Sequence, residues 1–253
     1  MSKVMVIPDE LFPSNHRQRI LIIGAGATGS AVAKELADID ATCKNLGYPG
    51  LELHIYDDRK VQPHHPGKQL YFPSDVGRYK SEVIAERIRF NYAEFDTLAF
   101  GYPERILADH NGNDSYRTSP TDIVIMCVNT TKSRREIYSS LHSVCIIDSG
   151  NGKDFGQILI GMTKTKQPEI SQETVDEIVM PHLRNMALIE YKEEDDSASC
   201  SSYESLSKQS LFINRALAVM IGNLIMTMIE TRMVFYKGIY LNLTTMQMVA
   251  EEL

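Results

Sequence analysis

The chain of 253 residues has no tryptophan and only four cysteines, Cys43, Cys127, Cys145 and Cys200. The cysteines lie far apart, and none has the short spacing to another that a zinc knuckle needs, so no zinc is expected. Sparse, unpaired cysteines are typical of proteins in a reducing compartment. We therefore expect a cytoplasmic protein.

An excess of positive charge is also missing, because 26 lysines and arginines face 33 aspartates and glutamates, a net charge of −7. Nucleic-acid-binding surfaces are ordinarily basic, so no nucleic-acid partner is expected. The N-terminus lacks the charged, apolar and small-residue order of a secretory signal. The long apolar run at 211–229 contains Asn214, Arg215 and Asn223, which are costly in a bilayer. We expect a buried helix there and no membrane association.

The most informative segment is a glycine-rich turn. An apolar strand expected at 20–23 leads into Gly24, Gly26 and Gly29 and then into a helix. Glycine allows the tight turn and lets the backbone approach a phosphate, which the N–H groups and dipole of the helix then attract. A second strand, expected at 51–56, ends at Asp57, where a carboxylate can accept hydrogen bonds from ribose hydroxyls. The segment predicts a nucleotide-binding βαβ unit without identifying the nucleotide.

Strands and helices alternate through the first half of the chain. We expect strands at 19–24, 51–57, 97–100, 122–128 and 144–148, and helices at 30–43, at 80–90 and from 133. This order predicts an α/β fold, with a Rossmann-like, mainly parallel sheet covered by helices on both faces. An antiparallel extension is expected at 149–162, followed later by a C-terminal helix at 203–233 and a final strand at 238–243.

The domain organisation expected from this pattern is simple. Residues 1–17, with Pro8 and Pro13, are expected to form an irregular N-terminal arm. Residues 18–253 are expected to form a single domain, with a polar crossing loop at about 163–200.

Several motifs resemble those of the ThiF/MoeB/HesA superfamily, the bacterial relatives of ubiquitin-activating enzymes. The order and spacing of the motifs extend over nearly the whole chain and look closest to the ThiF-type protein of the ParB-related, ThiF-related (PRTRC) cassette. The matching segments are Gly24-Ala25-Gly26-Ala27-Thr28-Gly29-Ser30 for GxGGxGS; Asp57, Arg59 and Val61 for DxDxV; His65, Lys68 and Gln69 for NxxRQ; Asp75 to Lys80 for DxGxxK; and Asn91, Ser199-Cys200 and the closing YKGIYLNL.

The resemblance implies a ThiF-like adenylation domain that uses ATP and Mg²⁺. Its substrate would be the C-terminal carboxylate of a small ubiquitin-like protein of the β-grasp type, the kind of protein that such cassettes also carry. The resemblance further implies a homodimer and a conjugating-enzyme-like partner.

The resemblance also assigns roles to individual residues. Gly24, Gly26, Gly29 and Asp57 would hold the nucleotide, Lys80 would contact its phosphates, and Gln69 would add a polar contact. Lys68 replaces the arginine of the family and can meet a phosphate only as a point charge. Arg134 matches an arginine at the start of a helix, with a surface cation as the alternative.

The magnesium-binding aspartate of the family is replaced by Asn129, whose neutral oxygen would hold the metal more weakly. Arg59, in place of the second acid of DxD, acts in the same direction. No metal ligands are therefore assigned. His64 and His65 lack the spacing of a metal site as well.

Cys200 falls where some relatives carry the ubiquitin-like protein as a thioester. Its expected position just before a helix would lower the pKa of the thiol, whereas the acidic run 193–196 would raise it. The alternative is a loop cysteine without a task, and the two interpretations have even weight.

Two other functions stay open. A ThiF-like scaffold with a decayed site, which binds the ubiquitin-like partner without catalysis, would explain Asn129, Arg59 and Lys68. A nicotinamide-dependent oxidoreductase would explain the glycine turn and Asp57, but it has no use for Lys80 or for the Lys68-Gln69 pair.

Overall fold

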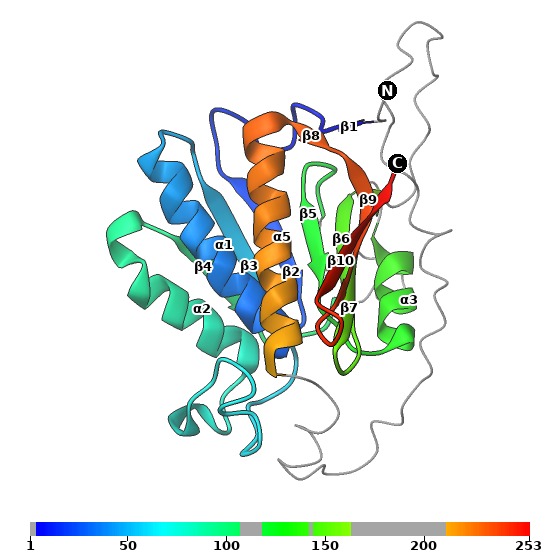
Figure 1. The fold of residues 1–253 in the computed structure, drawn as a ribbon. Helices are drawn as coiled ribbons and strands as arrows, with labels where there is room; N and C mark the ends of the chain where they lie inside the picture. Colours follow the sequence, from blue (N-terminus) through cyan, green and yellow to red (C-terminus); the bar gives the residue numbers. More distant parts are fainter. Residues whose placement is uncertain (1–3, 107–117, 142–143, 163–210) are drawn as a thin grey trace, which may run out of the picture.

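The computed structural model describes residues 4–106, 118–141, 144–162 and 211–253, and its centre is an eight-stranded sheet (Figure 1). Strands β4, β3, β2, β5 and β6 run parallel in that spatial order, and β7, β9 and β10 extend the sheet antiparallel beyond β6. The strands are β2 (Gln18–Ile23), β3 (Leu51–Tyr56), β4 (Leu98–Tyr102), β5 (Ile123–Met126), β6 (Cys145–Asn151), β7 (Phe155–Met162), β9 (Tyr236–Asn242) and β10 (Gln247–Glu252).

Helices cover both faces of the sheet. Helices α1 (Ala27–Asn45), α2 (Lys80–Asn91) and α5 (Leu211–Thr231) lie on one face, and α3 (Thr131–Ser140) lies on the other (Figure 1). Side chains of β2 alternate between the two cores, so that Ile20 and Ile22 face α1 while Leu21 and Ile23 belong to the core beside α3. Short 3₁₀ turns, η1 (Pro73–Asp75) and η2 (Ala93–Phe95), flank α2. The predicted Rossmann-like fold class is confirmed.

Helix α5 is long and apolar enough to cross a bilayer by composition alone. Here it packs along α1, and its apolar side chains, among them Ile213, Leu217 and Ile221, are buried in the core. Arg215 and Asn223 are exposed. The helix is therefore a core element, as expected, and its apolar character is explained by burial on the sheet.

The N-terminal arm differs from the expectation of irregular structure. Strand β1 (Met5–Val6) pairs antiparallel with β8 (Met233–Val234), and Ile7 and Leu11 behind it are buried. Arg232 donates hydrogen bonds to the carbonyls of Leu11 and Phe12. The partner strand lies more than 220 residues away, so no local pattern in the arm could have indicated this pairing.

The C-terminus also differs, because the strand expected to close the chain is followed by another. After β9 the chain turns at Asn242, whose side-chain oxygen accepts hydrogen bonds from the N–H groups of Thr244 and Thr245. This turn starts a hairpin whose second strand is β10, an exposed edge strand. The crossing loop expected at 163–200, and the first residues of the helix expected from 203, lie outside the described residues.

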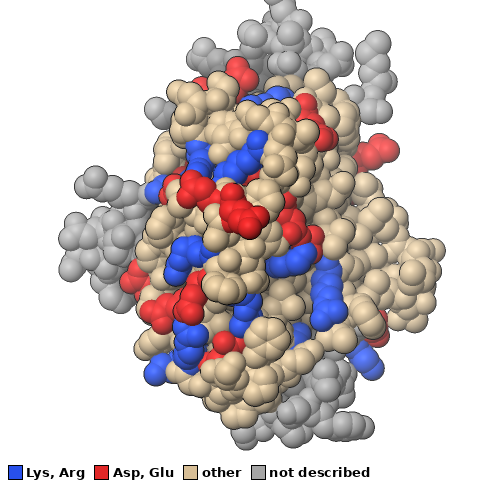
Figure 2. Space-filling view, turned by 90° about the vertical axis from the view of Figure 1, so that its left-hand side faces the viewer, with Lys and Arg blue, Asp and Glu red and all other residues tan. Residues whose placement is uncertain are grey.

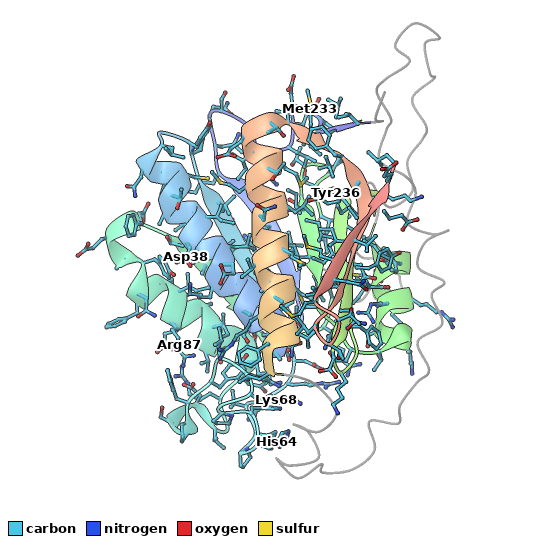
Figure 3. All side chains as sticks on the ribbon, in the orientation of Figure 1. Asp38, His64, Lys68, Arg87, Met233 and Tyr236 are labelled. Carbon is cyan, nitrogen blue, oxygen red and sulfur yellow. The ribbon has the colours of Figure 1, made fainter. Side chains whose placement is uncertain are left out.

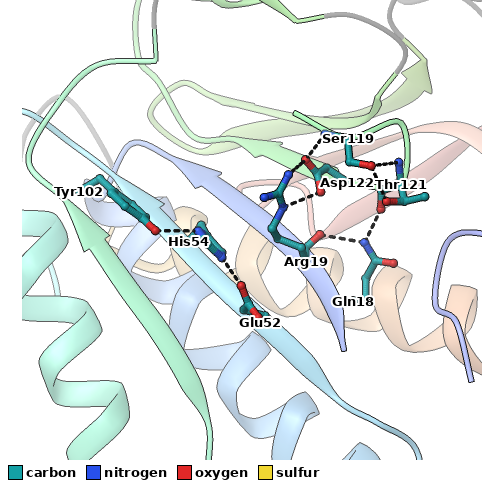
Figure 4. Close-up of polar contacts among 8 residues, drawn as sticks. All are labelled: Gln18, Arg19, Glu52, His54, Tyr102, Ser119, Thr121 and Asp122. Atoms are coloured by element: carbon teal, nitrogen blue, oxygen red, sulfur yellow. Dashed lines mark hydrogen bonds and ion pairs between the residues drawn. The ribbon is translucent and has the colours of Figure 1, made fainter. Parts of the chain in front are cut away.

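A polar network joins the beginnings of the central strands (Figure 4). The buried carboxylate of Asp122, before β5, accepts a hydrogen bond from Nε of Arg19 on β2 at 2.7 Å. Gln18 donates to the carbonyl of Thr121 at 2.7 Å. These contacts fix the parallel register of β2 and β5, whose opposite ends carry the candidate site.

Asp40 of α1 makes the most buried of the polar contacts that hold the helix to the sheet. Its carboxylate accepts hydrogen bonds from the backbone N–H of Leu51 at 2.7 Å and from the hydroxyl of Thr97 at 2.6 Å, and it pairs with Lys44 at 2.7 Å. The carboxylate is fully buried, so without it the N–H of Leu51 and the hydroxyl of Thr97 would lose their acceptor.

We expect Asp40→Ala to lower the free energy of unfolding by about 3 kcal/mol, since it removes one partner from a buried network. Urea unfolding followed by circular dichroism measures the loss. Asp9→Ala, at an exposed acid, serves as the control and should unfold within about 0.5 kcal/mol of the parent. Equal stability of the two variants would contradict this role of Asp40.

Candidate nucleotide site

The glycine-rich turn lies at the point where the order of the strands in the sheet reverses. From β2 the chain crosses to β3 on one side, and β5 flanks β2 on the other, so a crevice is expected at the carboxyl ends of β2 and β5. Gly24 has φ +94°, and a Cβ there would lie 2.8 Å from the carbonyl oxygen of Cys127. Its N–H donates to the carbonyl of Tyr56 at 2.8 Å. Only glycine fits this position.

Gly29 and Gly26 have different tasks. A Cβ on Gly29 would lie 1.8 Å from the carbonyl oxygen of Gly24, so glycine here lets α1 pack onto the turn. A Cβ on Gly26 would meet nothing within 4 Å, so the space in front of the helix is open. Helix α1 has no side-chain cap and no acid in its first turn. Its first N–H groups and its dipole therefore present an anion-binding end.

Asp57 is tied to the turn itself. One carboxylate oxygen accepts the backbone N–H of Ala25 at 2.7 Å, and the other accepts the N–H of Arg59 at 2.8 Å. Each carboxylate oxygen can accept more than one hydrogen bond, so the half-buried side chain still has capacity for ribose hydroxyls. Asp57 thus has a structural role that the sequence did not indicate, and its contact with a ribose stays a prediction.

Lys80 is the first residue of α2 and only 4% exposed. Its ammonium group makes no hydrogen bond or ion pair with a described residue and lies 6.0 Å from the ring centre of Tyr71. Burial lowers the pKa of Lys80 to about 8, while Asp57 raises that pKa and Arg59 lowers it further. A buried cation without a partner is costly. An anion bound beside it would remove that cost.

Lys68, on the loop from 58 to 79, lies at the same end of the molecule as His64 (Figure 3), and Gln69 is its neighbour in the sequence. The side-chain oxygen of Gln69 is the one buried side-chain nitrogen or oxygen, among the described residues, that lacks a hydrogen-bond partner. The hydroxyl of Tyr71 donates to the carbonyl of Ala25 at 2.6 Å and joins the loop to the glycine turn.

The pKa of His65 is affected by the positive charges of this region. Burial lowers its pKa to about 3, and the positive charges of Lys80, Lys68 and Arg59, together with His64, lower it further. Its Nδ1 accepts the N–H of Gln62 at 2.8 Å, so the neutral ring carries its proton on Nε2. The lysines predicted from the sequence therefore converge, as an anion site requires.

Arg87 of α2 supports the loop from behind. It pairs with the buried carboxylate of Asp75 at 2.7 Å and donates to the carbonyl of Leu70, next to Gln69. Its guanidinium lies 4.5 Å from the ring centre of Phe72. No sequence pattern indicated Arg87, Tyr71 or the packing of His65, since their roles depend on contacts between the loop, α2 and the glycine turn.

Arg134 and Asn129 lie on the other side of the crevice. The guanidinium of Arg134 is buried, bonds to Asp148 on β6 at 3.0 Å and donates to the carbonyl of Ser149 at 2.6 Å. Burial raises the pKa of Asp148, and the arginine opposes that shift. The surface-cation alternative for Arg134 is therefore wrong. Asn129 is exposed, between β5 and α3.

The cysteines divide into two groups. Cys43, Cys127 and Cys145 are buried, and burial raises their pKa values to about 11, 12 and 12. A raised pKa disfavours the thiolate, so these three are core residues rather than nucleophiles. Cys200, the candidate thioester residue, lies outside the described residues.

The donor set does not fit a metal held by the protein. Within the described ranges, no three His, Cys, Asp or Glu side chains are grouped to hold an ion. Asp58 is paired with Arg105 at 2.7 Å, and both oxygens of Asp57 bond to backbone. His64 and His65 pack edge to face, with ring centres 4.4 Å apart.

A cavity of about 430 Å³ lies elsewhere, between α2 and β4. Figure 2 shows this side of the molecule, on which acidic and basic side chains are intermixed. Arg78 and Glu86, two of the lining residues, are an ion pair at 2.5 Å. This mixed surface lacks the positive field of the region around Lys80.

Comparisons with known proteins agree with this geometry. The sequence profile of the ThiF family matches residues 2–169. No curated protein sequence matches the chain. Similar solved structures include PaaA, with a TM-score of 0.60 and 16% identity; the match covers 96% of this chain and 65% of PaaA. Another is MccB of E. coli, with a TM-score of 0.59 and 15% identity; the match covers 96% of this chain and 63% of MccB. The structure of E. coli MccB with ATP has a TM-score of 0.59 and 16% identity; the match covers 96% of this chain and 65% of that chain. This chain therefore spans about two thirds of the length of these proteins.

We expect the affinity for inorganic pyrophosphate to depend on the protonation of Lys80. The side chain is a cation below its pKa of about 8 and neutral above it, so affinity falls as the pH rises from 7 to 9. Titration calorimetry should show the Kd rising about tenfold more in the parent than in Lys80→Met. Lys60→Met, at an exposed lysine, should keep the parental pH dependence. Equal pH profiles for the parent and Lys80→Met would disprove the assignment.

Proposed function

Because the chain belongs to the ThiF family, we propose that it is an adenylating enzyme that activates a carboxylate with ATP. The observation that carries the proposal is the buried ammonium of Lys80, which has no hydrogen bond or ion pair with a described residue and interacts electrostatically with Asp57 at the glycine turn. Lys68 and Arg59 add positive charge to the same region. A polyphosphate is the ligand that this combination of cations and backbone N–H groups suits best.

In the proposed reaction, a carboxylate oxygen of the substrate attacks the α-phosphorus of ATP. The bond from that phosphorus to the bridging oxygen of the β-phosphate breaks, and pyrophosphate leaves with the electron pair. The products are an acyl-adenylate and pyrophosphate. Because both reactants are anions, the protein has mainly to position them and to neutralise their repulsion.

The residues divide these tasks. The backbone of Gly26 and the first turn of α1 receive phosphate oxygens, and Asp57 receives the ribose. Lys80 and Lys68 neutralise the charge that moves onto pyrophosphate. The orphan oxygen of Gln69 accepts a hydrogen bond from the ligand or from water held by it.

Magnesium has no place of its own among the described residues. Mg²⁺ commonly keeps several waters and is held through substrate phosphates with one or two carboxylates. Among the candidate residues, only the half-buried Asp57 has a carboxylate, and the exposed Asn129 has a neutral side-chain oxygen. We therefore assign no catalytic step to a metal.

The substrate that we propose is the C-terminal carboxylate of a small ubiquitin-like protein. The motif order closest to the PRTRC branch supports it, since such cassettes also carry a ubiquitin-like protein. Transfer to Cys200 as a thioester, a homodimer and a conjugating-enzyme-like partner belong to the same proposal. The expected cytoplasmic location fits an enzyme that draws on cellular ATP.

A decayed scaffold is the second candidate. It is favoured by the pairing of Asp58 with Arg105 and by Asn129 at the magnesium position. It predicts that the ubiquitin-like protein binds equally well with and without nucleotide. A nicotinamide-dependent oxidoreductase is weaker, since it leaves without a task the buried Lys80 and the side-chain oxygen of Gln69, neither of which has a hydrogen-bond partner for its side chain among the described residues.

The deciding experiment is ATP–pyrophosphate exchange with magnesium and the ubiquitin-like protein. We expect exchange that requires the partner and falls about 100-fold in Lys80→Met, because a buried cation facing transferred charge is lost. Lys80→Met is a cleaner test than Asp57→Ala, since Asp57 also holds the turn. Partner binding without any exchange would favour the scaffold, and Cys200→Ser then tests the thioester separately.

Two glycine variants separate the ligand space from the fold. Gly26→Val places its side chain in open space, so unfolding should change by less than about 1 kcal/mol while exchange is lost. Gly29→Ala meets the carbonyl of Gly24 and should cost at least about 3 kcal/mol. Thermal unfolding and the exchange assay measure the two effects. Full exchange by Gly26→Val would argue against phosphates at this turn.

A further inference from the structure

The side chain of Tyr71 connects the loop from 58 to 79 with the glycine turn. Its hydroxyl donates a hydrogen bond to the backbone carbonyl of Ala25 at 2.6 Å, and the same oxygen lies 3.5 Å from the carbonyl of Lys80 at the start of α2. Because the hydroxyl has a single proton, the shorter contact is the one that it makes. Tyr71 is only 3% exposed, and burial raises its pKa, so the hydroxyl stays protonated and is a donor.

The carbonyl that Tyr71 binds belongs to the same peptide group as the N–H of Gly26. This peptide group is trans. In a trans peptide group the C=O and the N–H point in opposite directions. By holding the carbonyl of Ala25, the hydroxyl of Tyr71 therefore also fixes the direction of the N–H of Gly26, which points away from it.

The N–H of Gly26 is directed into open space. The N–H groups before it in the turn are used, since that of Gly24 donates to the carbonyl of Tyr56 and that of Ala25 donates to the carboxylate of Asp57. The N–H of Gly26, in contrast, has no acceptor among the described residues. Gly26 is half-exposed, and a Cβ there would meet nothing within 4 Å. The turn thus presents this N–H to a ligand in front of α1.

Lys80 gives an independent reason to expect an anion at this place. It is only 4% exposed, and its ammonium group has no hydrogen bond or ion pair with a described residue. The ammonium interacts electrostatically with Asp57 at the turn and lies 6.0 Å from the ring centre of Tyr71. A bound phosphate would supply the negative charge that this buried cation lacks. Tyr71 therefore contacts the turn with its hydroxyl and lies beside the cation with its ring.

Glycine at position 26 makes the hold of Tyr71 on the turn necessary. The backbone of Gly26 has φ −74° and ψ −153°. Turning the peptide group between Ala25 and Gly26 by half a rotation would carry this φ to a positive value, which glycine adopts readily. The turned group would direct its carbonyl oxygen, instead of its N–H, toward the ligand. A donor for the anion would then be replaced by a partial negative charge that repels it.

We propose that Tyr71 is a positioning residue of the nucleotide site, whose hydroxyl holds the peptide group between Ala25 and Gly26 so that the N–H of Gly26 donates to a phosphate oxygen. Tyr71 acts through the backbone of the turn. This inference rests on the nucleotide binding proposed above. It gives the loop from 58 to 79 a part in shaping the phosphate site, beside the charge that Lys68 brings to it.

Tyr71→Phe tests the inference, because it removes the hydroxyl and keeps the ring beside Lys80. We expect the Kd for inorganic pyrophosphate to rise about tenfold, the effect of losing one hydrogen bond to a charged group. The melting temperature should stay within about 5 °C of the parent, because the released carbonyl can turn to the open space and be hydrated. Titration calorimetry measures the Kd, and circular dichroism measures the melting temperature.

Nuclear magnetic resonance can observe the peptide group itself. Ala25-Gly26 is the one Ala-Gly pair in the sequence, so labelling alanine with ¹³C at its carbonyl and glycine with ¹⁵N gives a single correlated amide signal. In the parent we expect pyrophosphate to move the amide proton of Gly26 downfield, as entry into a hydrogen bond does. In Tyr71→Phe this shift should be lost, even at saturating pyrophosphate. A purely structural role of the hydroxyl would leave the shift in place.

The matched control is Tyr92→Phe, which removes a hydroxyl that bonds to Asp38, further along α1. It should keep the parental Kd and the parental amide shift. A parental Kd or a parental amide shift in Tyr71→Phe would overturn the inference, as would a parent that binds pyrophosphate without a shift of this amide. A fall of the melting temperature by more than about 10 °C in Tyr71→Phe would show that the hydroxyl supports the fold instead, and would overturn it as well.

The failure of the proposed function is separate from the failure of this inference. If the parent itself binds no pyrophosphate, the proposed function fails first, and the titration of the parent shows this before any variant is compared. If the parent binds pyrophosphate but Tyr71→Phe behaves like it, the nucleotide site stands and the role of Tyr71 is disproved.

Discussion

The close packing of the glycine turn between β2 and α1 is the constraint on which the site depends. A Cβ on Gly29 would lie 1.8 Å from the carbonyl oxygen of Gly24, and Gly24 itself lies against the carbonyl of Cys127, the residue after β5. Because there is no room for side chains at Gly24 and Gly29, helix α1 packs closely onto the short turn that separates it from β2. Its unsatisfied N–H groups are then exposed at the crevice between β2 and β5.

Two parts of the fold hold the positively charged residues around this turn, the start of α2 and the loop from 58 to 79. Lys80 is placed by the start of α2, next to the end of β3, and its burial keeps the cation desolvated. Lys68 and Gln69 depend on a loop that Tyr71 fastens to the turn and Arg87 fastens to α2. The rigid part of the site therefore comes from the sheet, whereas the loop contributes polar groups through only a few contacts.

Much of the fold was predictable because strong local patterns carried it. Apolar strands ending in glycine or acid, and helices of ordinary length between them, indicated the parallel sheet and its order of elements. The errors came at the two ends. The pairing of β1 with β8 and the added strand β10 depend on partners distant in sequence or on exposed residues, such as Met248, without a clear alternation.

By itself, the sequence determined the glycine turn, the acid at the end of β3 and the cations Lys68 and Lys80, because these residue types are needed locally for a turn and for charge. Only the tertiary structure decided that the oxygens of Asp57 bind backbone, that Arg134 pairs with Asp148 inside the protein, and that Tyr71 binds the carbonyl of Ala25. The physical reason is that hydrogen bonds in a buried site join segments far apart in the chain. A linear pattern records which residue types are present, but the pairing of their donors and acceptors is set by how the elements pack.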